Sequence, residues 1–75
     1  SMLGKARLLR KLISARRLEA RDVLYVGDEV RDIEAAHAAG AVSVAVSWGY
    51  ADRAALERAK PTHLVDRPEQ LLSLV

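Results

Sequence analysis

"VLYVGDEVRD", residues 23–32, runs a short apolar stretch rich in β-forming residues into a glycine and then places two aspartates four positions apart. A continuous apolar run of this kind is typical of a parallel strand that is covered on both faces. Gly27 allows a sharp turn, after which apolar residues recur every three positions until Gly40. The segment therefore predicts a strand over residues 23–26 and a helix over residues 30–39.

The two aspartates of this segment are candidate metal ligands. Asp28 follows the strand and Asp32 falls in the first turn of the helix, so their Cβ atoms are expected about 5–6 Å apart on one side. Two carboxylates at an open edge suit Mg²⁺, which prefers one or two such ligands and keeps its other positions for water and phosphate. The same spacing also fits simple helix capping, with Asp28 as the cap and Asp32 in the first turn.

A basic amphipathic helix is predicted upstream, over residues 5–18. Its apolar stripe comprises Leu8, Leu9, Leu12 and Ile13. Because a helix that runs antiparallel to the strands begins where the strands end, Lys5 is expected near the carboxyl edge of the sheet. A cation there could meet the two carboxylates, although Lys5 alone also fits a solvated helix face.

Downstream of Gly40 the chain continues to alternate between strands and helices. Residues 42–46 and 62–65 read as strands, and Asp52 is a suitable cap for a short helix between them. Asp66 and Glu69 form a possible capping box before a closing helix. Strands joined by helices must pair in parallel, so the chain predicts a three-layer α/β fold.

The carboxyl edge of this sheet is the expected functional edge. Ligands of such folds bind beyond the carboxyl ends of the strands, and the loops with polar and aromatic residues fall there. Besides the candidate ligands, the possible substrate-facing residues are Gly27, Glu29, Ser47 and Trp48.

The composition indicates one small folded domain over residues 3–75. Of the 75 residues 51% are hydrophobic, which argues against disorder, and no apolar run approaches the about 20 residues that a membrane helix needs. We expect Ser1 and Met2 to be a tag remnant. The lack of cysteine suits a reducing cytoplasm, and no membrane partner is expected.

The charge is unevenly distributed along the chain. Residues 1–21 carry seven Lys or Arg and one Glu (+6), and residues 22–75 carry five and nine acids (−4). A nucleic-acid-binding surface often has such a patch, but it usually includes aromatic side chains that stack on bases, and residues 1–21 contain none. We therefore predict a solvated helix face and no nucleic-acid partner.

Four segments together resemble the haloacid dehalogenase (HAD) superfamily, in particular the C-terminal half of phosphoglycolate-phosphatase-like hydrolases. They are "GKARLLRKLI" (4–13), "VLYVGDEVRDIEAAHAAG" (23–40), "VSVAVSWGY" (42–50) and "PTHLVDRPEQLLSL" (61–74). The resemblance implies part of a Rossmann-like core domain and a Mg²⁺-dependent phosphatase that acts on a small phosphorylated metabolite.

The resemblance also implies a role for each of three residues. Lys5 matches the lysine of the family's third motif, which neutralises the phosphoryl group. Asp28 matches a Mg²⁺ ligand of the fourth motif. Asp32 matches the second acid, which binds the ion through water or orients the lysine. Phosphoryl transfer depends mainly on positioning and charge stabilisation, so these residue types suit the reaction.

The chain departs from the family in lacking the nucleophile. Members carry a DxD motif before the lysine, but no two of the five aspartates here lie two positions apart. Ser47 follows the acidic pair, so it cannot be the second-motif hydroxyl, which precedes the lysine. We expect a fragment that is inactive alone and that either binds its missing N-terminal half or self-associates through the open strand edge.

Two other classes of protein remain open from the sequence. One is a non-catalytic module that binds phosphate, a metal or a protein partner. A receiver-like domain belongs to that class, but its lysine comes late in the chain, whereas Lys5 comes first. The other is a structural fragment with no function of its own.

Overall fold

The computed structural model describes residues 2–75. Ser1, expected in a tag remnant with Met2, lies outside them, and helix α1 (Met2–Ala15) begins at Met2. No helix of the described part of the chain has the length and apolar character needed to span a bilayer.

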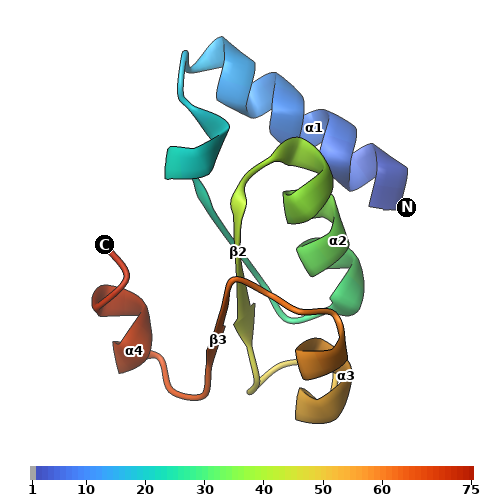
Figure 1. Ribbon diagram of the computed structural model, residues 1–75, viewed down its shortest axis with the longest axis vertical. Helices are drawn as coiled ribbons and strands as arrows, with labels where there is room; N and C mark the ends of the chain where they lie inside the picture. Colours follow the sequence, from blue (N-terminus) through green and yellow to red (C-terminus); the bar gives the residue numbers. More distant parts are fainter. Residues whose placement is uncertain (1) are drawn as a thin grey trace.

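A three-stranded parallel sheet forms the centre of the protein (Figure 1). Strands β1 (Leu24–Gly27), β2 (Val42–Val46) and β3 (His63–Val65) lie side by side in chain order. Helix α2 (Val30–Ala39) connects the first pair and helix α3 (Arg53–Arg58) the second. The strands end together because Gly27 pairs with Ala45, and Val46 with Val65. The predicted parallel α/β fold is confirmed.

Helices cover the two faces of the sheet unequally. Figure 1 shows α1, α2 and α3 on one side of the strands and α4 (Glu69–Leu72) on the other. Ile33, Ala45 and Leu56 form one buried cluster, which joins α2 and α3 to β2. The opposite face of β2 and β3 contributes the valines of a second cluster, against which Leu71 and Leu74 pack. The layers are therefore three, but the α4 layer is small.

Helix α2 has the predicted bounds. Ile33 and Ala36 are buried, as their spacing predicts, and Glu29 is the N-cap residue. The helix ends at Gly40, whose φ of 78° lies in the left-handed region that glycine adopts most readily. Helix α2 begins at Val30, shortly after β1 ends at Gly27, so Asp28 lies in the short connection and Asp32 in the first turn of the helix.

The first helix differs from its predicted range of 5–18. It ends at Ala15, after which Arg17 adopts a φ of 55° and a short 3-10 helix, η1 (Ala20–Asp22), follows. The predicted apolar stripe is only half buried. Leu9 and Ile13 face the core, whereas Leu8 and Leu12 are 60% and 50% exposed.

The apolar run of β1 by itself predicts coverage on both faces, which is wrong for Val26, whereas the missing family half predicts an open strand edge, as observed. Val26 is 47% exposed, because β1 lies at the edge of the sheet and α4 packs near β2 and β3. The apolar run of β1 therefore presents an open side.

The predicted capping box of Asp66 and Glu69 is also wrong. Helix α4 begins after Pro68 without a side-chain cap, and it ends at Leu72. The Gln70 side chain instead accepts the N–H groups of Asp66 and Arg67, at 2.6 and 2.9 Å. The Asp66 carboxylate is occupied elsewhere, at the carboxyl edge of the sheet.

Candidate active site

Lys5 and Asp32 meet at the carboxyl edge of the sheet. The Lys5 ammonium donates to Asp32 Oδ1 at 2.5 Å, although 27 positions separate the two residues. This contact arises because α1 packs against α2 (Figure 1), which brings Lys5 near the start of α1 to Asp32 in the first turn of α2. The predicted meeting of Lys5 with an acid of the pair is observed.

Asp32 has partners for both of its carboxylate oxygens. Its Oδ2 accepts the N–H of Glu29 at 3.1 Å, while Oδ1 accepts from Lys5. The residue is only 7% exposed, so this carboxylate is buried with its charge balanced. The hydrogen bond to Asp32 is the main cause that raises the pKa of Lys5 above its ordinary value, and the lysine remains protonated at neutral pH.

Gly27 gives Asp32 the space that it occupies. A Cβ atom at this position would come closer than 3.0 Å to the Asp32 side chain, a separation that real Cβ atoms essentially never show. The glycine between β1 and α2 therefore serves the close packing of a carboxylate as well as the turn.

Asp28 has different surroundings from Asp32. Its Oδ2 accepts the backbone N–H of Tyr50 at 3.0 Å, and its carbonyl oxygen accepts the N–H of Ala51, also at 3.0 Å. No described residue donates a hydrogen bond to Oδ1. The carboxylate is thus held by one oxygen, and the other can bind a ligand.

The ends of β2 and β3 are joined by a second polar cluster. Ser47 donates to Asp66 at 2.6 Å, and Arg53 forms two hydrogen bonds with the same carboxylate, at 2.9 and 3.1 Å. These contacts, Arg53 first, lower the pKa of Asp66 from 3.8 to about 2. The sequence placed Ser47 at this edge and assigned Asp66 to a helix cap, and no pattern in it indicated that Arg53 would contact Asp66.

The other predicted edge residues lie at the rim. Glu29 forms an ion pair with Arg31 at 3.0 Å, and Trp48 is 47% exposed. Their contact with a substrate stays a prediction.

The donor set at this edge fits a Mg²⁺ ion that is shared with other ligands. Asp28 has one carboxylate oxygen to which no residue of the described part of the chain donates, whereas both oxygens of Asp32 accept hydrogen bonds. Among residues 2–75, no group of three or more acids or histidines is arranged to hold a metal ion. A single carboxylate is nevertheless within the usual range for Mg²⁺, which takes its remaining ligands from water and phosphate.

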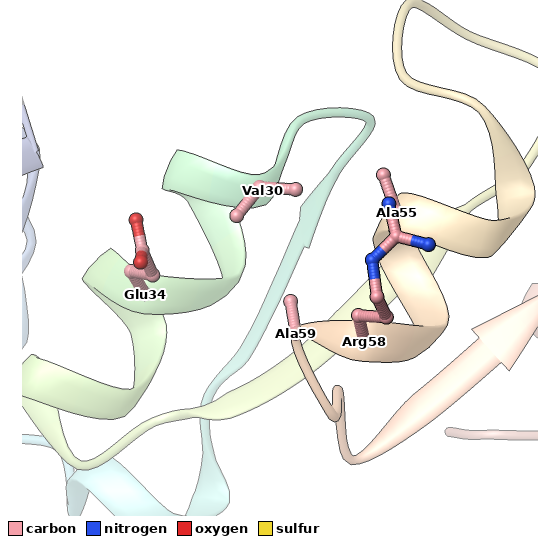
Figure 2. A pocket seen from close by; sticks show the side chains of 5 residues that line it. All are labelled: Val30, Glu34, Ala55, Arg58 and Ala59. Atoms are coloured by element: carbon pink, nitrogen blue, oxygen red, sulfur yellow. The ribbon is translucent and has the colours of Figure 1, made fainter.

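Two hollows lie away from the acids. A pocket of about 450 Å³ lies between α2 and α3 and is lined by Val30, Glu34, Ala55, Arg58 and Ala59 (Figure 2). An apolar groove of about 310 Å³ lies between α1 and β1, with Leu9, Leu12, Ile13, Arg16, Leu18, Val23, Leu24 and Tyr25 in its walls. Neither contains a residue that the sequence singled out for chemistry.

Comparison with known proteins agrees with this arrangement. The model of the family described as HAD-hydrolase-like matches residues 3–71, which is nearly the whole chain. The chain belongs to the haloacid dehalogenase-like hydrolases. The resemblance stated from the sequence is thereby confirmed, and the acids and lysine described above lie in the matched segment.

Several relatives of this HAD-like chain are named phosphatases. It is 43% identical over 74 residues to a phosphoglycolate phosphatase of Synechococcus elongatus, covering 99% of this chain and 35% of that protein. It is 36% identical over 67 residues to the pyrophosphatase PpaX of Bacillus mycoides, covering 89% of this chain and 31% of that protein. The chain thus spans about a third of the length of these relatives.

A solved structure confirms the fold. A haloacid dehalogenase-like family hydrolase from Streptococcus pneumoniae superposes with a TM-score of 0.86 at 22% identity, covering 92% of this chain and 33% of that one. The parallel sheet with its flanking helices therefore has the same fold as the matched third of that hydrolase.

Proposed function

We propose that this chain forms the lysine- and acid-bearing part of a Mg²⁺-dependent phosphatase. Its substrate would be a small phosphomonoester similar to phosphoglycolate, and the nucleophilic aspartate would come from residues outside these 75. Relatives named phosphoglycolate phosphatase support this substrate class, since they share about 40% of their residues with this chain over the matched lengths.

The contact between Lys5 and Asp32 carries the proposal. A buried carboxylate fixes an ammonium group at the carboxyl edge of a parallel sheet, next to the strand end that bears Asp28. A fixed cation there would stabilise the negative charge on the equatorial oxygens of a phosphoryl group during transfer. An ordinary surface lysine would have no need of such a buried partner.

Asp28 would hold the metal ion through Oδ1, which accepts no hydrogen bond from residues 2–75. When bound, Mg²⁺ would neutralise phosphate charge and orient the phosphoryl group. Asp32 would act on Lys5 rather than on the ion, because its two oxygens already accept hydrogen bonds. Of the two roles that the family resemblance implies for Asp32, these hydrogen bonds favour the orientation of the lysine.

In the proposed reaction, the phosphoryl group passes first to the aspartate nucleophile and then to water. A bond forms between the carboxylate and phosphorus while the P–O bond to the ester oxygen breaks, and that oxygen takes a proton from solvent and leaves as an alcohol. Water then attacks the phosphorus of the acyl phosphate, the bond between phosphorus and the aspartate oxygen breaks, and inorganic phosphate leaves while the proton of the water passes to solvent, which restores the carboxylate. Lys5 would stabilise both steps by its positive charge, which the hydrogen bond to Asp32 holds in place.

The exposed edge strand β1 is an argument for a partner that would extend the sheet. Val26 is half exposed on this edge strand, and the neighbouring groove is walled by apolar residues such as Leu12 and Leu18. We propose that the remaining part of a HAD core docks here and that the isolated chain is inactive and self-associates through this edge. Light scattering that shows a folded monomer at high concentration would argue against self-association.

A cytoplasmic location is proposed from the lack of cysteine.

A hybrid enzyme tests the function. In the Synechococcus elongatus phosphoglycolate phosphatase, residues 3–75 of this chain would replace the matching third of that protein. We expect the hybrid to release phosphate from phosphoglycolate only when Mg²⁺ is present. Lys5→Met and Asp28→Asn should each lower kcat by at least about 100-fold, as expected when a charge-stabilising group is lost.

The control is Lys11→Met, which removes another cation of α1 that lies away from the acids. Its kcat should match that of the unmodified hybrid, and circular dichroism should show all variants folded. Undiminished turnover of folded Lys5→Met and Asp28→Asn hybrids would refute the proposed roles.

A further inference from the structure

The loop of residues 47–52 holds the Asp28 side chain from one side. The Tyr50 N–H donates to Asp28 Oδ2 at 3.0 Å, and the next amide, of Ala51, donates to the carbonyl oxygen of Asp28 at 3.0 Å. The Tyr50 side chain is not needed for this contact, since the residue is 83% exposed and uses its backbone.

Gly49 lets the loop come this close. A Cβ atom at position 49 would lie closer than 3.0 Å to three atoms of the Asp28 side chain, so any other residue would push the carboxylate or the loop away. Asp28 is thus enclosed by a glycine and by two backbone N–H groups of one loop.

Both ends of this loop are fixed to the fold. At its start, Ser47 donates to Asp66 at 2.6 Å, and the same carboxylate is held by Arg53. At its end, Asp52 caps α3 by accepting the Ala55 N–H at 2.9 Å. The Tyr50 N–H therefore belongs to a loop whose two ends are held by hydrogen bonds.

We infer that the 47–52 loop positions the Asp28 carboxylate. The Tyr50 N–H holds one of its oxygens, and Gly49 allows the loop to approach it closely. By occupying Oδ2, the loop selects one orientation of the carboxylate and leaves Oδ1 for the metal ion. That the ligand of Oδ1 is a metal ion rests on the proposed function. Removing a hydrogen bond that orients a metal ligand typically weakens metal affinity by about 10- to 100-fold.

The first test needs no metal and uses the 75-residue chain labelled with ¹⁵N. Hydrogen exchange at the position-50 amide should be slow in the unmodified chain and at least about tenfold faster in Asp28→Ala. Tyr50→Ala keeps the backbone donor, so its position-50 amide should remain protected. Equal exchange rates in Asp28→Ala and the unmodified chain would overturn the inference.

The second test measures Mg²⁺ binding by calorimetry in the hybrid enzyme. Gly49→Ala should weaken binding by about 10- to 100-fold, with KM for phosphoglycolate at saturating Mg²⁺ unchanged. Gly4→Ala, a matched change in α1, should bind Mg²⁺ like the unmodified hybrid. Tyr50→Pro removes the donor without adding a Cβ at position 49, and it replaces Gly49→Ala if the latter fails to fold. Unchanged Mg²⁺ affinity in a folded variant of either kind would overturn the inference.

Failure of the proposed function gives a different pattern. If the unmodified hybrid neither binds Mg²⁺ nor needs it for turnover, the metal role of Asp28 is wrong, and the exchange experiment alone decides whether the loop positions that carboxylate.

Discussion

At the scale of single residues, the two acids of the GDxxxD segment perform different tasks. Asp32 is buried, and its two carboxylate oxygens accept hydrogen bonds from Lys5 and from the Glu29 N–H. Asp28 is held by one oxygen, through Tyr50. The spacing of the acids could be read from the sequence, but this division could not, because it depends on contacts from α1 and from the 47–52 loop.

Replacing Gly27 with alanine should disturb the buried acid. The added Cβ would overlap the Asp32 side chain, and overpacking of this kind typically costs about 1–3 kcal/mol. Urea denaturation of Gly27→Ala should show that loss in the free energy of unfolding. Gly4→Ala, in the exposed first turn of α1, should leave stability unchanged or raise it by up to about 1 kcal/mol. Equal stability of Gly27→Ala and the unmodified chain would show that the site has room for a side chain.

The Asp66 carboxyl group should titrate with a pKa of about 2. Because this folded-state pKa lies below the ordinary 3.8, the interaction with Arg53 stabilises the fold at higher pH, and the contribution disappears as the pH falls from 3.8 toward 2. Carboxyl ¹³C NMR should show the pKa rising toward its ordinary value in Arg53→Gln, though incompletely, since Ser47 still donates. The same pKa in both proteins would mean that Arg53 does not hold this group.

At the scale of elements, the sequence predicted best where the signal was local. The apolar spacing of α2 and its terminal Gly40 defined that helix correctly, and residues 42–46 are β2 as predicted. The end of α1, the 3-10 helix η1 and the Asp66 capping box were missed or wrong. These features depend on tertiary partners, such as the Ser47 and Arg53 side chains that engage Asp66 in place of a helix end.

The short helix α3 should depend on its cap. It has six residues, and Asp52 accepts the Ala55 N–H at 2.9 Å. Removing such a cap usually costs about 1 kcal/mol, so Asp52→Ala should lower the melting temperature, whereas Asp52→Asn retains an acceptor and should change it little. Because α3 contributes the buried Leu56, which packs with Ile33 of α2, unfolding of α3 would also weaken the packing against α2. Identical melting of Asp52→Ala and Asp52→Asn would exclude a capping role.

At the scale of the whole molecule, the chain is a small α/β unit with one complete and one incomplete side. The helices α1, α2 and α3 cover one face of the sheet, and α4 covers only part of the other (Figure 1). The parallel sheet was predictable from the alternation of strands and helices. That β1 would be left open could be anticipated only from the family resemblance, because its apolar run by itself indicates a strand covered on both faces.

The position of a bound metal tests the central claim most directly. Crystals of the hybrid enzyme soaked in Mn²⁺ should show an anomalous difference peak bonded to Asp28 Oδ1, at about the 2.0–2.1 Å that Mg²⁺ itself adopts. Lys5 should remain on Asp32 in the same crystals. A peak bonded to Asp32 with Lys5 displaced, or no peak at the carboxyl edge of the sheet, would contradict the account.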